Sequence, residues 1–258
     1  TAESHSPAVS RRAWRGLGVA YLSAGRVDEA ALAWRQVIGG EEEFALWGHQ
    51  AELLGDWQRA RNWYQLAAQL APQNGDAWYR LARASAQLGD GTAADSYLQA
   101  LAAPEHTLFG RSTILTRLGE LNRNSTPPNW AASLAQFEAA LQQDQFTEAG
   151  DRQRAQLGRA EALDQLGQTT AALAAYREAA AEWPNHYWAN VHSGRLTWYV
   201  EHDVARAVAY LEQAIALDGE NKWAYLFLGG IYVETNQPEA AIPLLNRVLE
   251  LDPANETA

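Results

Sequence analysis

The sequence predicts an all-α protein in which short helices pack in antiparallel pairs. Ala, Leu, Gln, Glu and Arg dominate the composition, and β-branched residues are sparse, which favours helix throughout. A second observation is that one order of small, large and turn residues recurs along the whole chain. Glycines follow the first expected helix of many of these units, and prolines such as Pro72, Pro184 and Pro253 follow the second.

The stretch 222–253 shows the recurring order most clearly. Large and small residues mark a first helix, a polar turn follows at 235–237, and a second helix ends at a proline. The markers are Tyr225, Leu228, Gly229, Tyr232, Ala241, Leu245, Val248 and Pro253. This order resembles the tetratricopeptide repeat, a helix pair of about 34 residues. The resemblance implies an α-solenoid, a right-handed superhelix of about seven such antiparallel helix pairs.

We expect one solenoid domain over residues 8–255, after a flexible N-terminal tail at 1–7. Its seven repeats are expected at 11–40, 41–74, 75–107, 108–146, 150–186, 187–221 and 222–255. The register follows from the small residue that opens each second helix. These residues are Ala30, Ala60, Ala94, Ser133, Ala172, Ala207 and Ala241, which lie 30, 34, 39, 39, 35 and 34 residues apart. Both long spacings flank the fourth repeat, where a loop at 124–129 contains Pro127-Pro128.

Each repeat is expected to combine small residues, which let the helices approach, with large residues that fill the gaps between layers. The gap-filling residues are expected to be Trp14, Tyr21, Trp34, Tyr64 and Tyr176. No repeat could bury its apolar stripe alone, so at least about three are needed for a stable stack.

Composition restricts the classes of function. A net charge of −11 argues against a nucleic-acid-binding protein, and the absence of cysteine excludes disulfides and thiolate metal sites. No apolar run is long enough for a transmembrane segment. The chain begins at Thr1 and contains no Met, so we interpret it as a piece of a longer bacterial protein, either cytoplasmic or extracytoplasmic.

No catalytic signature is found, and we expect neither an enzyme nor a cofactor. Gly16-x-Gly18 lacks the third glycine of a dinucleotide-binding loop. The histidines His186, His192 and His202 lack the spacing of three or four residues that puts metal ligands on one helix face, so no metal site is predicted. Glu161 and Asp164 do lie three apart, but are interpreted as a solvated helix flank rather than a catalytic pair.

The resemblance implies that the first helices of successive repeats line a concave groove in which protein partners bind. The expected partner-binding residues are Arg15, His49, Tyr79, Arg83, Trp188, His192, Arg195, Tyr199, Trp223 and Phe227. Other positions in the same row are Arg12, Glu52, Thr116, Glu120, Arg123, Glu161 and Asp164. Aromatic residues beside an arginine are typical of binding hot spots. The alternative is that the aromatic residues form the core between repeats.

We therefore predict a non-catalytic protein-interaction scaffold that binds a peptide segment or a partner subunit in the groove. One alternative is an accessory domain of a larger, membrane-anchored enzyme, such as a polysaccharide polymerase or glycosyltransferase. Another is a structural element that self-associates through its uncapped C-terminal repeat.

Overall fold

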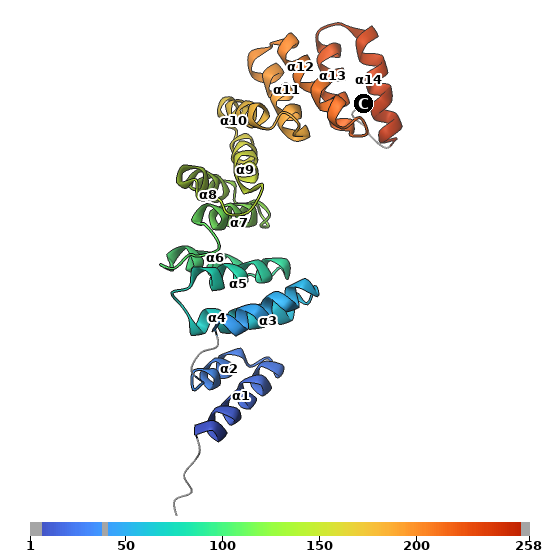
Figure 1. The fold of residues 1–258 in the computed structure, drawn as a ribbon. Helices are drawn as coiled ribbons and strands as arrows, with labels where there is room; N and C mark the ends of the chain where they lie inside the picture. Colours follow the sequence, from blue (N-terminus) through green and yellow to red (C-terminus); the bar gives the residue numbers. More distant parts are fainter. Residues whose placement is uncertain (1–6, 38–40, 254–258) are drawn as a thin grey trace, which may run out of the picture. The chain divides into compact units, whose positions relative to one another are not determined.

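The computed structural model describes residues 7–37 and 41–253, and shows helices joined by short connections (Figure 1). These residues form fourteen α-helices and no β-strand, which confirms the predicted all-α fold class. Most of the expected tail at 1–7 lies outside the described residues, and Pro7 is the first residue of α1. None of the described helices combines the length and the apolar character that crossing a membrane requires.

The helices follow one another in antiparallel pairs and divide between two compact units. Unit 1 comprises residues 1–121 and 143–149, and unit 2 comprises residues 122–142 and 150–258. The helices of the first part of the chain are α1 (Pro7–Ser23), α2 (Val27–Trp34), α3 (Glu41–Leu53), α4 (Trp57–Leu70), α5 (Gly75–Gln87), α6 (Ala93–Ala102) and α7 (Arg111–Arg123). Those of the second part are α8 (Trp130–Gln143), α9 (Asp151–Gln165), α10 (Thr169–Glu182), α11 (Tyr187–Glu201), α12 (Val204–Leu217), α13 (Lys222–Glu234) and α14 (Pro238–Leu251).

Glycine makes the sharp return between the helices of several pairs. Gly25, Gly55, Gly89 and Gly167 have φ angles of 67–74° and follow the first helices α1, α3, α5 and α9. This left-handed conformation costs glycine little, because it has no Cβ, and it lets the chain close the end of one helix and start the next.

Small residues on first helices allow large residues on second helices to pack directly against the backbone. A Cβ atom on Gly18 would lie 2.2 Å from the Trp34 side chain, and one on Gly48 would lie 2.5 Å from the Tyr64 ring. Trp34 and Tyr64 are both buried, as the sequence predicts for gap-filling residues. The same expectation is wrong for Trp14, which is 40% exposed. Trp14 lies on α1, the first helix described, whereas the buried Trp34 of α2 packs against Phe44 of α3, with 4.9 Å between ring centroids.

A non-helical segment at 144–149 connects α8 to α9 and belongs to unit 1. Its backbone is bound at the start of α7, where the Gln145 N–H donates to Ser112 Oγ at 2.8 Å. The Thr147 N–H donates to Thr113 Oγ1 at 3.0 Å. Gly110 permits this close approach, since a Cβ there would lie 1.9 Å from the Gln145 carbonyl oxygen. The irregular part of the chain is therefore an ordered segment that covers part of the first helices of unit 1.

Candidate functional site

Six of the predicted binding residues form one aromatic cluster on the first helices of unit 2. Helix α11 carries Trp188, His192, Arg195 and Tyr199 at a spacing that puts them on one face, and α13 carries Trp223 and Phe227. Trp188 and Trp223 are separated by 35 residues, as are His192 and Phe227, so they hold equivalent positions in successive helix pairs. We call these six residues the aromatic cluster.

Contacts join the two helices of the aromatic cluster and fix its arginine. The Arg195 guanidinium lies 5.9 Å from the centroid of the Phe227 ring, within the range of a cation–π contact, and it forms an ion pair with Asp164 on α9. The rings of Trp223 and Phe227 stack at 6.0 Å. Arg195 is thereby held in one orientation before any partner binds.

The aromatic cluster is only partly buried. Trp188 and Trp223 are each 40% exposed, and Tyr199 is 69% exposed. The aromatic residues therefore contribute to the packing between helices and at the same time present apolar surface to solvent. The sequence left groove and core as alternatives, and in the structure these side chains combine features of both.

His192 is enclosed between two aromatic rings. It stacks on Tyr176 with 4.7 Å between centroids, and on Trp188 with 5.7 Å. Burial, and secondarily the positive charge of Arg195, lower the pKa of His192 to about 4, although Asp164 acts in the opposite direction. His192 is consequently neutral near pH 7 and acts there as a flat, uncharged ring that supports Trp188.

The predicted residues of unit 1 lie in a different chemical setting. Arg15, His49, Arg83 and Arg117, on α1, α3, α5 and α7, are separated by 34 residues each. We call these four residues the basic column. Arg83 and Arg117 flank the carboxylate of Glu148, which lies 3.8 Å from the first and 2.5 Å from the second.

Further carboxylates accompany the other members of the basic column. Glu52 lies 2.5 Å from Arg83 and 3.9 Å from His49, while Arg15 faces Glu43 at 3.5 Å, with both of these side chains about half exposed. Tyr79, also predicted as a binding residue, is fully buried, and its hydroxyl donates to Glu148 at 2.9 Å. The role of Tyr79 in this face is therefore to hold Glu148 in place.

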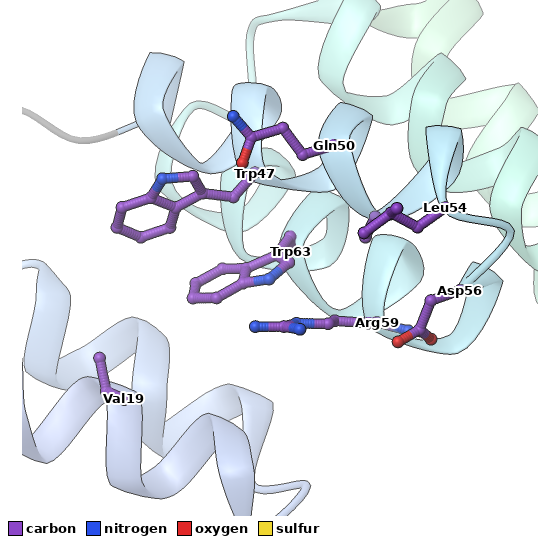
Figure 2. Close-up of a pocket in the computed structure, with 8 residues that line it drawn as sticks. Val19, Trp47, Gln50, Leu54, Asp56, Arg59 and Trp63 are labelled. Atoms are coloured by element: carbon purple, nitrogen blue, oxygen red, sulfur yellow. The ribbon is translucent and has the colours of Figure 1, made fainter.

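A pocket that the sequence did not predict lies between α1 and the pair α3–α4. Its cavity of about 370 Å³ is lined by Val19, Trp47, Leu54, Arg59 and Trp63, among others. Figure 2 shows the two indoles side by side, with the Arg59 guanidinium next to Trp63 and pointing away from Asp56.

One sequence signal could have indicated this pocket. Gly48 and Tyr64 form a small–large pair separated by 16 residues, whereas their neighbours Trp47 and Trp63 form a large–large pair at the same separation. The two indoles contact edge to face at 4.8 Å. Two indoles that face each other across one helix pair cannot both fit between the helices, so part of their surface faces the pocket.

The described residues contain no group of three or more His, Cys, Asp or Glu side chains that could hold a metal ion. The expected row also included Glu161, whose carboxylate forms an ion pair with Arg123 at 3.1 Å within unit 2. Asp164 is likewise engaged, by Arg195. These carboxylates neutralise nearby arginines, which agrees with a structural role.

Comparison with known proteins identifies the repeat. A family model described as tetratricopeptide repeat matches residues 53–107 and 201–258, and a second model of the same description matches residues 1–38 and 129–187. Together the two models cover most of the chain. None of the curated proteins matches it.

Several solved structures are similar in fold. PilW, described as a widely conserved type IV pilus biogenesis factor, is 19% identical with a TM-score of 0.61, covering 84% of this chain and 96% of PilW. PilF of Pseudomonas aeruginosa is 16% identical with a TM-score of 0.60, covering 97% and 96%. The C-terminal part of a repeat protein from Cytophaga hutchinsonii is 14% identical with a TM-score of 0.65, covering 95% and 96%. Identities this low show a shared fold alone.

Proposed function

Because the chain belongs to the tetratricopeptide repeat family, we propose that it is a protein-interaction scaffold that binds a peptide segment of a partner on the first helices of unit 2. The fold supports an interaction role in general, since stacked helix pairs create extended binding surfaces. The matching models describe a repeat and no catalytic family. The aromatic cluster is the proposed site.

The observation that supports this site best is the pair Trp188 and Trp223. These two large apolar side chains hold equivalent positions in successive helix pairs. Each stays 40% exposed, although each packs beside another aromatic ring. Exposed tryptophan is costly to leave in water and is enriched at the centres of protein interfaces. A partner that covers both indoles would bury apolar surface on a preorganised site.

Arg195 and Tyr199 give the same face a polar contribution. Arg195 already has Asp164 as a partner, so its remaining N–H groups can donate to backbone carbonyls without leaving an unpaired charge. Tyr199 follows Arg195 by four residues on α11 and is exposed, so it offers both an apolar ring and a hydroxyl to a partner. The proposed ligand is therefore a peptide with large apolar side chains spaced to meet the two indoles.

The test is a selection of random peptides displayed on phage against the intact chain, followed by titration of the selected peptides. The double variant Trp188→Ala/Trp223→Ala should lose at least about 30-fold in affinity, since truncating one hot-spot tryptophan costs about 2 kcal/mol or more. Trp14→Ala is the matched control, because Trp14 is also 40% exposed but lies in unit 1. Equal affinities of the double variant and the wild type would reject the site.

A further inference from the structure

One carboxylate that contacts the basic column of unit 1 does not come from the helices that carry the column. Three residues after His49 comes Glu52, and three residues after Arg117 comes Glu120, so α3 and α7 each supply an acid beside their member of the column. At the equivalent position of α5, three residues after Arg83, the residue is Ala86. Arg83 pairs instead with Glu52 of α3 at 2.5 Å and also lies 3.8 Å from Glu148, which comes from outside the helices of the column.

Glu148 is bound as a ligand carboxylate would be. It accepts one charge-assisted hydrogen bond from Arg117 and one hydrogen bond from the Tyr79 hydroxyl at 2.9 Å, with Arg83 at 3.8 Å. Burial acts to raise the pKa of Glu148, but the hydrogen bonds from Arg117 and Tyr79 outweigh it, so the pKa is lowered. The site therefore stabilises an ionised carboxylate.

The backbone around Glu148 is also held like that of a bound peptide. The segment 144–149 is non-helical, and alternate N–H groups, those of Gln145 and Thr147, donate to hydroxyls of Ser112 and Thr113 on α7. Hydrogen bonds to the backbone do not depend on the identity of the side chains. From this stretch, Glu148 forms ion pairs with two members of the basic column, Arg83 and Arg117.

We propose that the basic column binds extended acidic peptide segments of a partner protein, and that residues 144–149 are a built-in ligand that occupies this surface until such a segment displaces them. The proposal extends the interaction role proposed above, but to other residues and another ligand class. The aromatic cluster selects apolar side chains, whereas this surface selects a glutamate or aspartate on an extended backbone.

A built-in ligand has a strong advantage over a free peptide. A segment tethered by short connections acts at an effective concentration on the order of millimolar, so a free peptide at micromolar concentration cannot compete well. Binding in trans should therefore increase when the segment is dislodged. Gly110→Ala does this without altering the basic column, because the new methyl group would lie 1.9 Å from the Gln145 carbonyl oxygen.

The experiment uses a fluorescent peptide that copies residues 143–150. Its ends are acetylated and amidated, so that no terminal carboxylate competes with the side chain of the glutamate that copies Glu148. Its binding to the intact chain is measured by fluorescence polarisation. We expect the double variant Gly110→Ala/Glu148→Gln to bind the peptide at least tenfold more tightly than the wild type does. Adding Arg117→Ala to it should reverse at least tenfold of that gain, since Arg117 donates the charge-assisted hydrogen bond to the glutamate carboxylate and such bonds are worth about 1.5–3 kcal/mol.

Three controls separate the possible outcomes. Gly91→Ala, where an added Cβ meets nothing within 4 Å, should leave peptide affinity at the wild-type value. A peptide with Gln in place of the glutamate should bind at least tenfold more weakly to the double variant. Trp188→Ala/Trp223→Ala should leave this binding unchanged, so that failure of the aromatic cluster and failure of the basic column are distinguishable.

The proposal is overturned if the double variant keeps its helical circular dichroism but binds the peptide no better than the wild type. It is also overturned if the peptide binds equally well with Gln at position 148. If the double variant loses helical signal, the single variant Glu148→Gln replaces it, and this variant must still show stronger binding of the acidic peptide than the wild type.

Discussion

Replacing Gly194 by alanine should lower the stability of unit 2, whereas the same change at Gly230, also in unit 2, should raise it. Gly194 on α11 packs against α12, and a Cβ there would lie 2.6 Å from Leu211 Cγ and 3.0 Å from the Ala207 carbonyl oxygen. Leu211 is fully buried and the second obstacle is backbone, so neither can move away easily. Gly230 on α13 has no atom within 4 Å of the added Cβ.

The two effects can be estimated separately. Overpacking a buried contact costs about 1–3 kcal/mol. Alanine gains about 0.5–1 kcal/mol over glycine inside a helix. Gly194→Ala should therefore lose roughly 1–2 kcal/mol, while Gly230→Ala should gain about 0.5–1 kcal/mol.

Urea unfolding at 25 °C, followed by far-ultraviolet circular dichroism, measures both free energies of unfolding. The transition that reports unit 2 should move to lower urea for Gly194→Ala and to higher urea for Gly230→Ala. If both variants shifted in the same direction, helix propensity rather than close helix approach would govern these positions, and the packing argument would be refuted.

Two further predictions concern buried polar groups. Asp76→Ala should lower stability by about 2–4 kcal/mol in a urea titration, because the buried carboxylate accepts hydrogen bonds from the backbone N–H groups of residues 107–109 and from a threonine hydroxyl, while Asp76→Asn should lose less. For His192, the folded-state pKa of about 4 lies below the unfolded value of about 6.5, so the unfolded chain binds more protons between these values. Stability should be complete above about pH 6.5 and fall by about 2 kcal/mol on going to pH 5, and His192→Phe, which keeps a ring beside Tyr176 and Trp188, should reduce that fall. An equal pH dependence in His192→Phe and wild type would contradict the assignment.

The fold class could be predicted from the sequence because its signals are local and repeated. Gly48 and Tyr64 belong to one helix pair, and a turn glycine such as Gly89 acts within a few residues. Such signals recur at nearly constant spacing, so a weak match in one pair is supported by the others. The aromatic cluster was predicted for the same reason, since Trp188 and Trp223 hold equivalent positions.

What the sequence did not indicate depends on contacts between distant or irregular parts. Nothing in the residues around Glu148 shows that this segment lies on α5 and α7, because a non-helical stretch has no periodicity to define its partners. Trp14 was expected to be buried because its position in the pattern is usually interior, but burial also depends on what packs outside the helix. Predicting the pocket beside Trp63 would have required knowing that the side chains of Trp47 and Trp63 contact each other.

The most direct test of the proposed function is to observe the tryptophan indoles while a selected peptide binds. The chain contains 11 tryptophans, and their indole N–H signals can be recorded individually after ¹⁵N labelling and assigned by substitution. We predict that the signals of Trp188 and Trp223 shift on titration, whereas that of buried Trp34 stays in place. Shifts confined to Trp47 and Trp63, which line the pocket of unit 1, would contradict the assignment of the binding face to unit 2.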